Sequence, residues 1–425
     1  MRVLMFGWEF PPHIAGGLGT ACLGMTRGLL HQGVEVSFVL PKLFGGEEGD
    51  RMRMLSAEDV GLTLSSQEIA HLATHLRIVG VDSFLHPYLN IQDVYSTSRD
   101  QTFGVNLAVH HWSQQKFTFS GKYGASLLDE VARYALVAAS IASQESFDII
   151  HAHDWLTYLA GLAAKRISNK PLVVHVHATE FDRSGENVNQ LVYDIERAGM
   201  EGADRVITVS HRTRDIVIER YGIHPDKVVT VHNAVDFADD YRGALPRPFP
   251  EKVVTFLGRV TFQKGPDYFV EAAYKVIQKM PNVRFVMAGS GDMLNRMIRR
   301  VAALGIATKF HFAGFLQGAE VDRMYRMSDV YVMPSVSEPF GITPLEAMRN
   351  GVPVIISKQS GVAEVLKYAL KVDFWDVDDM ANAIYGLLNY NALQRFFQEH
   401  GQHEVTTLKW DAAALRIKEI YQSLL

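Results

Sequence analysis

The chain has 425 residues, which is too long for one ordinary α/β core and predicts two domains, each able to bury its own core. Hydrophobic residues make up 48% of the sequence and charged residues 21%, as in soluble globular enzymes, which excludes a disordered or fibrous chain. The 42 basic and 47 acidic residues leave a net charge of −5 and form no basic run, so no nucleic acid partner is expected.

Cysteine content and hydropathy bear on the cellular compartment. Cys22 is the single cysteine, so no internal disulfide can form, and the first residues do not follow the pattern of a cleavable signal. Charged or polar residues interrupt every apolar stretch before the roughly 18 to 20 residues of a membrane span. We therefore expect a cytoplasmic protein without a transmembrane segment. The sequence does not indicate its oligomeric state.

The first half of the chain alternates short apolar runs with helical patterns. An apolar run at 2–6, a glycine- and proline-rich turn, a helical pattern at 23–30 and a second run at 34–40 predict a βαβ unit. Continuous hydrophobicity is typical of strands buried on both faces of a parallel sheet. Further strands of this kind are expected at 148–151, 172–177, 205–210 and 228–232. We interpret 44–123 as extra strands and a loop near the cleft.

A second βα series follows a proline-rich stretch, 243–250, which predicts a linker. Its strands are expected at 253–257, 283–288, 309–313, 330–333 and 352–356, and an amphipathic helix is expected from Trp410 to Leu425. The fold class is therefore α/β, with two doubly wound Rossmann-like domains and parallel sheets. We place the N-terminal domain at 1–242, the nucleotide-binding domain at 243–408 and the final helix at 409–425. Ligands of such sheets bind beyond the carboxyl ends of the strands, so the site is expected in the interdomain cleft.

Glycines stand between the first expected strand and helix, in Ala-Gly16-Gly17-Leu-Gly-Thr. Glycine lets the backbone approach an anion, while the start of the helix supplies unpaired N–H donors. The stretch is not the G-x-G-x-x-G dinucleotide fingerprint, and no acidic residue follows the second strand. A tight turn that simply requires glycine explains this loop equally well.

Two cations follow the first strand of the second series, in Gly-Arg259-Val-Thr-Phe-Gln-Lys264-Gly. A diphosphate leaving group gains negative charge as its bond to a sugar breaks, and fixed cations stabilise that charge most in the transition state. Lysine and arginine are more often solvated at the surface. Their place at a strand end, flanked by glycines, favours the functional interpretation.

The most informative stretch is Ser-Glu338-Pro-Phe340-Gly341-Ile342-Thr343-Pro-Leu-Glu346-Ala-Met. Thr343 and Glu346 fit the first and last positions of a capping box, which would give Glu346 a structural role. Glu338 has no such local role, since it lies in the loop before the helix. A carboxylate beside a helix N-terminus that can bind an anion suits a sugar phosphate.

These residues resemble the retaining glycosyltransferases of family four, which have the two-Rossmann GT-B fold. Glu338 and Glu346 match the E-x7-E motif of that family, and Arg259 with Lys264 matches its R-x4-K phosphate clamp. Gly-Gly-Leu at 16–18 is similar to the N-terminal glycine loop, and His-Ala-His-Asp-Trp at 151–155 to a strand end of glycogen and starch synthases. The motifs stand in the family order along nearly the whole chain.

The resemblance implies a role for each residue of the site. Glu338 would contact the hydroxyls of the donor sugar, with His177 beside that sugar, and Glu346 would hold the ribose. Arg259 and Lys264 would stabilise the leaving diphosphate. The remaining donor-binding residues are Gly16, Gly17, Phe340, Gly341, Ile342 and Thr343, and the cleft-facing or acceptor-facing residues are His13, His153 and Asp154.

The resemblance also implies the reaction and its partners. Glucose would pass with retention from a nucleotide diphosphate sugar to a glucan or other sugar acceptor, without a metal or other cofactor, and the final helix would cross back onto the N-terminal domain. One departure bears on the substrate: synthases that use ADP-glucose carry a lysine two residues before the paired glycines, where this chain has Ile14. His13 stands beside it and is an alternative donor to a phosphate.

Two other functions remain open on the sequence. His151 and His153, like His175 and His177, recur with the period of a strand, and with Asp154 they could hold the metal of a hydrolase. The second half of the chain offers no further ligand cluster and carries phosphate-type loops, which disfavours that hypothesis. A nucleotide-sugar epimerase of the same fold is the other alternative, because the fold does not decide the reaction.

Overall fold

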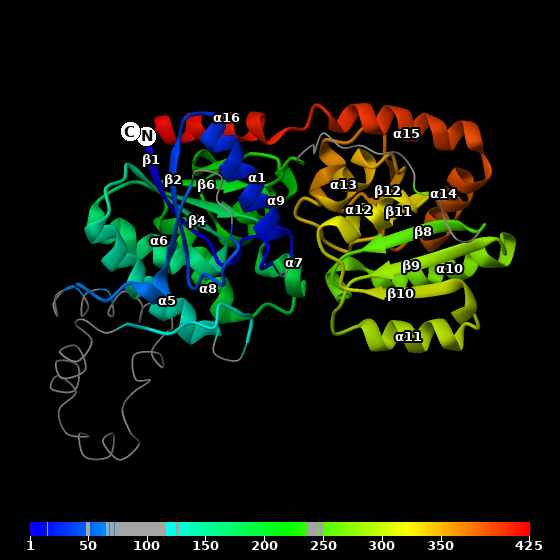
Figure 1. The fold of residues 1–425 in the computed structure, drawn as a ribbon, viewed down its shortest axis with the longest axis horizontal. Helices are drawn as coiled ribbons and strands as arrows, with labels where there is room; N and C mark the ends of the chain where they lie inside the picture. The colour runs from blue at the N-terminus through cyan, green and yellow to red at the C-terminus, as the bar shows by residue number, and fades with distance from the viewer. Residues whose placement is uncertain are drawn as a thin grey trace, which may run out of the picture.

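The computed structural model describes residues 1–14, 16–47, 52–64, 68, 72, 116–124, 127–235, 245 and 250–425. They form two Rossmann-like α/β domains, each built on one parallel sheet, which confirms the predicted fold class (Figure 1). The N-terminal domain holds a seven-stranded sheet and the C-terminal domain a six-stranded one. The predicted boundary at 242/243, most of the predicted linker and most of the stretch 44–123 lie outside the described residues.

The N-terminal sheet has the strand order β3-β2-β1-β4-β5-β6-β7 and is parallel throughout. Its strands are β1 (Arg2–Phe6), β2 (Glu35–Leu40), β3 (Arg53–Ser56), β4 (Ile149–His153), β5 (Leu172–Val176), β6 (Arg205–Thr208) and β7 (Val228–Thr230). Its helices are α1 (Gly17–His31), α5 (Leu127–Gln144), α6 (Trp155–Ser168), α7 (Glu180–Ser184), α8 (Gln190–Gly202) and α9 (His211–Tyr221), with short 3₁₀ turns η1 (Ala57–Asp59) and η2 (Pro225–Lys227).

The C-terminal sheet repeats this arrangement in the order β10-β9-β8-β11-β12-β13. Its strands are β8 (Lys252–Leu257), β9 (Val283–Ala288), β10 (Phe310–Gly314), β11 (Val330–Met333), β12 (Val354–Ser357) and β13 (Leu370–Val372). Its helices are α10 (Pro266–Lys279), α11 (Leu294–Ala303), α12 (Ala319–Arg326), α13 (Thr343–Arg349), α14 (Val377–Asn389) and α15 (Asn391–Val405), with 3₁₀ turns η3 (Phe262–Lys264), η4 (Ala307–Lys309) and η5 (Gly361–Glu364).

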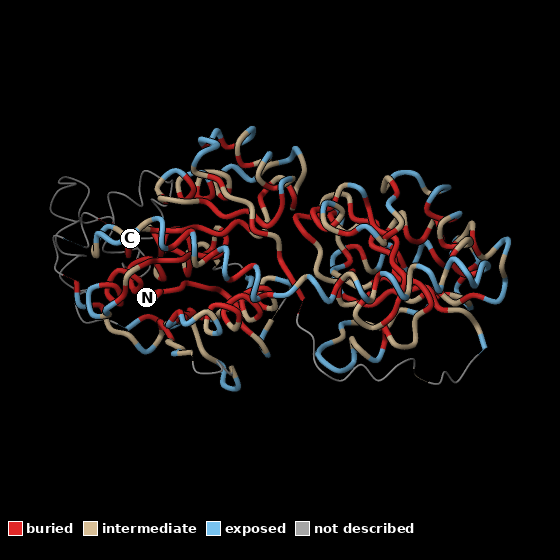
Figure 2. The backbone as a smooth tube through the Cα atoms, turned by 90° about the horizontal axis from the view of Figure 1, so that it is seen from above, coloured by how far each residue is buried: buried red, intermediate tan, exposed pale blue. Residues whose placement is uncertain are grey.

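Each sheet is covered on both faces, which explains why its strands are apolar without alternation. In the N-terminal domain α5, α6 and α8 pack on one face and α1 with α16 (Trp410–Gln422) on the other. In the C-terminal domain α10, α11 and α14 cover one face, and α12 and α13 the other. Figure 2 shows the buried residues gathered in the interiors of the two domains.

The last helix belongs to the N-terminal domain in space. The chain leaves α15 on the C-terminal domain and returns so that α16 runs beside α1 (Figure 1). Glycines on α1 make this approach close: a Cβ at Gly24 would lie 2.1 Å from the indole nitrogen of Trp410, and a Cβ at Gly28 would lie 2.8 Å from the Trp410 carbonyl oxygen. Because that oxygen is backbone, α16 would have to shift to accept a larger residue at position 28.

We expect Gly28→Ala to lower the free energy of unfolding by about 1 to 3 kcal/mol, the usual cost of overpacking, in spite of the better helix propensity of alanine. Gly17→Ala on the same helix is the control, because its added Cβ meets no packing neighbour within 4 Å in the part of the chain that the structure describes. Urea unfolding monitored by circular dichroism measures both. Equal stabilities of the two variants would contradict the close packing of α16 on α1.

Candidate active site

The predicted site residues follow the strands at which each sheet reverses its order. In the N-terminal sheet β1 and β4 are neighbours although they are far apart in sequence, and in the C-terminal sheet the same holds for β8 and β11. The crevice at the carboxyl ends of two such strands is the usual ligand site of an open α/β sheet. Gly16 and Gly17 follow β1 and Asp154 follows β4, while Arg259 follows β8 and Glu338 follows β11.

Lys264 and Glu338 meet directly at the C-terminal switch point. The Lys264 ammonium donates to Glu338 Oε2 at 2.5 Å, and the Ser335 hydroxyl donates to the same oxygen at 3.2 Å. The two charged side chains are only 20% and 9% exposed, so Lys264 is not the solvated surface cation that is usual for lysine. Gly265 brings their segments together, since a Cβ there would lie 2.1 Å from the Pro334 carbonyl oxygen.

Arg259 follows β8, in the loop that also leads to Lys264. Its guanidinium donates to Gln263 Oε1 at 3.3 Å. Desolvation and the neighbouring Glu9 raise the pKa of Tyr123, and the charge of Arg259 acts against them, which places Arg259 close to that hydroxyl. Glu9 in turn accepts from the Tyr123 hydroxyl at 3.2 Å and from the Gly19 amide at 3.0 Å, at the start of α1. Arg259 is therefore within electrostatic range of a tyrosine whose hydroxyl bonds to Glu9, a residue that also binds the start of α1.

The paired glycines have no structural requirement of their own. Among the described residues, no side chain or distant backbone atom lies within 4 Å of a Cβ built at Gly16 or Gly17, and neither glycine has a left-handed φ. Gly19 differs, because its Cβ would lie 2.4 Å from Cγ2 of Ile14. Gly19, inside the first turn of α1, therefore has a packing reason to be glycine that Gly16 and Gly17 lack. His13, the suggested phosphate donor, instead has its Nε2 2.9 Å from the Gly45 carbonyl oxygen.

His177, just after β5, is held by His153 and Asp154 at the end of β4. Its Nε2 lies 3.0 Å from Nδ1 of His153, and its backbone amide donates to Asp154 Oδ1 at 2.6 Å. Asp154 adopts a left-handed φ of 60°, a costly conformation for a residue with a side chain. Desolvation lowers the pKa of His177 to about 3 and raises that of Asp154 to about 6. At neutral pH His177 is therefore an uncharged hydrogen-bonding group, and Asp154 is an anion that fixes its backbone.

The structure also brings together the histidines of the metal hypothesis. Ring nitrogens of His151, His153 and His175 lie within 4.8 Å of one another, and burial lowers the pKa of all three. The rings of His151 and His175 are stacked, with 8° between their planes. The lone pair of a ring nitrogen lies in the plane of its ring, and two nearly parallel planes do not converge on one shared ion, so this arrangement differs from a tetrahedral metal site. The Tyr421 hydroxyl already pairs with Nδ1 of His151.

The predicted capping box at the start of α13 is wrong. Ile342, not Thr343, occupies the N-cap position, and its side chain makes no capping bond. The Thr343 hydroxyl instead accepts from the Tyr331 hydroxyl of β11 at 2.8 Å, because the helix packs directly over that strand. Glu346 lies one turn into α13, where burial raises its pKa and the charge of Arg349 opposes that shift. Glu346 is therefore free of the capping role.

The other residues of this loop have different surroundings. Phe340 is buried in the C-terminal core cluster, and its ring centroid lies 6.0 Å from that of His232 in the N-terminal domain. Ile342 packs against core residues of both domains. Gly341 has a φ of 103°, which a side chain would strain. Phe340 and Ile342 thus connect the two domains, whereas Gly341 shapes the loop between the two glutamates.

Several residues of the site were not predicted from the sequence. The Ser337 hydroxyl donates to Asp182 Oδ1 at 2.6 Å, which joins the loop before Glu338 to α7 of the N-terminal domain. Asp182 also closes a capping box with Thr179 at the start of α7. The Thr-x-x-Asp spacing gave a signal for that box. Nothing in the sequence pointed to the contact with Ser337, because the partners are 155 positions apart.

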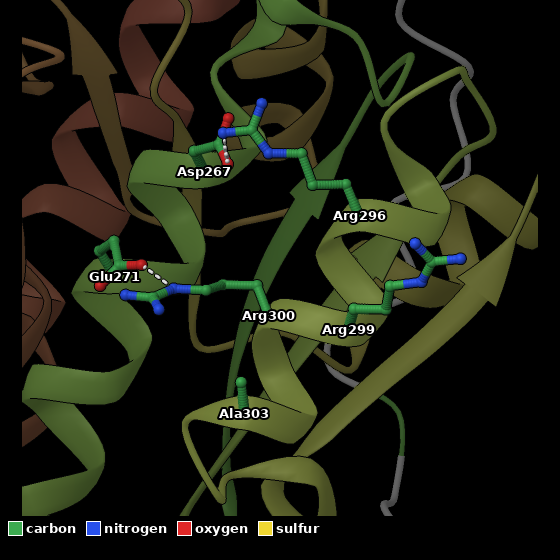
Figure 3. Close-up of a pocket in the computed structure, with 6 residues that line it drawn as sticks. All are labelled: Asp267, Glu271, Arg296, Arg299, Arg300 and Ala303. Carbon is green, nitrogen blue, oxygen red and sulfur yellow. Dashed lines mark hydrogen bonds and ion pairs between the residues drawn. The ribbon is translucent and has the colours of Figure 1, made fainter.

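A groove of about 590 Å³ lies elsewhere on the C-terminal domain, between α10 and α11. Figure 3 shows Arg296 directed at Asp267 and Arg300 at Glu271, and their closest nitrogen and oxygen atoms are 3.0 Å and 2.6 Å apart. None of the predicted site residues lines this groove. Its charges are largely paired, so it is not the expected diphosphate site.

Comparison with known proteins decides the family. The model for glycosyl transferases group 1 matches residues 238–404, and the model for Glycosyltransferase Family 4 matches residues 93–239. The chain belongs to glycosyltransferase family four. It is a glycosyltransferase with the GT-B fold, as the sequence predicted, and this membership sets aside the hydrolase and epimerase alternatives.

Relatives and solved structures agree with this family. An uncharacterised glycosyltransferase of Methanocaldococcus jannaschii is 27% identical over 99% of this chain and 98% of its own. Glycogen synthase of Mycobacterium tuberculosis is 24% identical over 99% of this chain and 94% of its own. Anabaena HepE, solved in complex with UDP-glucose, has the same fold with a TM-score of 0.67, 18% identity and full coverage of both chains. In the described part of this glycosyltransferase, no helix is both long and apolar enough to cross a membrane.

The raised pKa of Asp154 predicts that kcat depends on pH on the acidic side. We expect kcat to fall as the pH drops through about 6, because protonated Asp154 holds the His177 amide less firmly. His177, with a pKa of about 3, adds no limb of its own between pH 5 and 8. A pH profile of kcat measures this.

Asp154→Asn is the variant that assigns the limb, since its side chain does not titrate. Between the ordinary pKa of 3.8 and the folded value of about 6, the native state binds more protons than the unfolded state, so Asp154 stabilises the fold as the pH falls. A loss of activity in this window is therefore not unfolding caused by this group. A limb near pH 6 that persists in Asp154→Asn would contradict the assignment.

Proposed function

We propose that this protein transfers glucose, with retention of the anomeric configuration, from a nucleotide diphosphate sugar to a glucan or other sugar acceptor without a bound metal. One observation carries the proposal: a half-buried lysine and a buried glutamate are in contact where β8 and β11 end, and Arg259 lies in the same loop after β8. A fixed cation next to a fixed carboxylate suits the junction between a diphosphate and a sugar. The cation faces the departing phosphate and the carboxylate faces the sugar hydroxyls.

Lys264 and Arg259 supply the electrostatic part of the reaction. As the bond between the anomeric carbon and the phosphate oxygen breaks, negative charge collects on the diphosphate. Cations that are held in place, in surroundings poor in water, stabilise that charge without having to reorganise. Glu338 holds the Lys264 side chain in place before the donor arrives. The clamp therefore needs no metal ion.

The N-terminal domain contributes close backbone approach and an uncharged histidine. Gly16 and Gly17 have open space around a Cβ position among the described residues, and the backbone at the start of α1 can approach a phosphate there. His177, neutral at physiological pH, offers hydrogen bonds to the donor sugar without placing a second cation there. The acceptor hydroxyl attacks the anomeric carbon on the face that the diphosphate leaves. Its proton passes to the departing phosphate oxygen, which accounts for retention.

Glucose and uridine are the first choices for the donor. The similar fold of HepE was solved with UDP-glucose, and a relative that matches nearly the whole chain is named glycogen synthase. Ile14 stands where synthases that use ADP-glucose have lysine, which favours a base other than adenine. The acceptor is then a glucan or a smaller sugar.

A thermal-shift screen of nucleoside diphosphates and their sugars identifies the donor. Binding to the native state alone raises apparent stability with the logarithm of ligand concentration over its dissociation constant, by about 2.7 kcal/mol at a hundredfold excess. We expect UDP and UDP-glucose to give the largest shifts. A larger shift with ADP-glucose or a GDP-sugar would replace the proposed donor, and the absence of any shift would contradict nucleotide-sugar binding.

Lys264→Ala tests the proposed chemistry. We expect the folded variant to lose about 10²-fold or more in kcat, because one electrostatic contact to the developing charge is gone. The assay measures release of nucleoside diphosphate, which acceptor should accelerate in a transferase. Lys252→Ala is the control: Lys252 pairs with the buried Asp329 at 3.3 Å, at the opposite end of β8. It should keep near-normal turnover, and full activity in Lys264→Ala would rule out the clamp.

A further inference from the structure

A carboxylate of the C-terminal domain caps a helix of the N-terminal domain. Glu364, at the end of η5, accepts from the backbone amides of His211 and Arg212 at 2.9 and 2.8 Å, and its Oε2 lies 2.8 Å from Nε2 of His232. The first amides of a helix have no partner within it, and a negative charge there is favourable. The start of α9 is therefore completed by a side chain from the other domain.

The same end of α9 holds the loop that carries Glu338. The Arg212 guanidinium donates to the Ser337 hydroxyl at 3.1 Å, and the Thr213 hydroxyl donates to the Pro339 carbonyl oxygen at 3.4 Å. Ser337 and Pro339 are the two neighbours of Glu338 in the chain. The residues on both sides of Glu338 are thus hydrogen-bonded to α9, whereas the Glu338 carboxylate itself binds Lys264 in the C-terminal domain.

Backbone contacts link η5 to Glu338 as well. The Gly361 amide, at the start of η5, donates to the Glu338 carbonyl oxygen at 2.9 Å. A Cβ at Gly361 would lie 2.1 Å from the Pro339 carbonyl oxygen and 2.5 Å from Cβ of Ser210, the N-cap of α9. These three segments are therefore packed against one another at backbone distance, and none can move far without the others.

The pKa of Glu364 is consistent with strong hydrogen bonds to its carboxylate. Burial raises its pKa, but the hydrogen bonds from His232 and from the two amides outweigh burial and hold the pKa below its ordinary value. The carboxylate is therefore ionised at neutral pH. An ionised acceptor makes stronger hydrogen bonds than a neutral one.

We propose that Glu364 is a positioning residue for the transfer reaction: by capping α9 it closes the two domains against each other and fixes the loop that presents Glu338 to the donor sugar. Domain closure and placement of Glu338 are then one event. This inference rests on the proposed role of Glu338. It assigns Glu364 no contact with donor or acceptor, and it predicts that nucleotide binding and turnover depend on Glu364 to different degrees.

The test is Glu364→Gln. Glutamine has nearly the same shape but offers one acceptor oxygen, so one of the two amides of α9 would face an NH₂ group. We expect kcat to fall by about 10-fold to 10²-fold, the usual effect of misplacing a reacting group, while the affinity for nucleoside diphosphate stays within about twofold. Small-angle scattering with nucleotide bound should show a less compact protein than the wild type.

Glu404→Gln is the matched control. Glu404 caps two amides in the same way, those of Lys367 and Tyr368 at 2.8 and 3.0 Å, but within the C-terminal domain. It should keep wild-type kcat and compactness. His232→Ala, which removes one partner of Glu364, should lower kcat less than Glu364→Gln and supplies the answer if Glu364→Gln does not fold.

Four outcomes would overturn the proposal. The first is wild-type kcat in Glu364→Gln, and the second is wild-type kcat in His232→Ala when Glu364→Gln does not fold. The other two are an equal loss of kcat in Glu404→Gln and a loss of nucleotide affinity in Glu364→Gln that parallels its loss of kcat. The wild-type outcomes would leave the phosphate clamp standing if Lys264→Ala is still inactive. Full activity of Lys264→Ala would instead reject the proposed function itself. The two failures are therefore distinguishable.

Discussion

Charged side chains that are shielded from solvent need a partner of opposite charge. Lys264 and Glu338 are both largely shielded, and they contact each other where β8 and β11 end. The contact holds a cation ready at the place where a diphosphate gains charge. It also ties the segment after β8 to the segment after β11, with Gly265 allowing their close approach. The arrangement of the other site residues follows from this pairing.

Sheet topology explains why residues so distant in sequence come together. Both sheets are parallel and reverse their order between neighbouring strands, β1 and β4 in one domain and β8 and β11 in the other. Loops that follow these strands therefore meet at one end of each sheet. The N-terminal loops supply open glycine backbone and a neutral histidine, and the C-terminal loops supply charge. Contacts from α7 and α9 to the loop around Glu338 join the two sets.

The sequence predicted the fold well where buried strands leave a continuous apolar run. The run at 2–6 is β1 without change, and the run at 283–288 is β9. β13 was missed because a strand of three residues gives too short a signal. The predicted capping box at Thr343 is wrong because the Thr343 hydroxyl accepts a hydrogen bond from Tyr331 of β11. Local sequence spacing cannot reveal such a tertiary contact. The hydrogen bonds between Glu364 and the start of α9 join residues more than 150 positions apart, so they could not be predicted from the sequence either.

A crystal structure with a nucleoside diphosphate bound tests the central claim most directly. The account predicts that oxygens of the terminal phosphate lie within hydrogen-bonding distance of Lys264 Nζ and the Arg259 guanidinium, with the backbone of Gly16 and Gly17 nearby. It also predicts that Glu338 stays beside Lys264, on the side where the sugar would be. A diphosphate bound away from Lys264 and Arg259, or cations turned toward solvent while it is bound, would contradict the account.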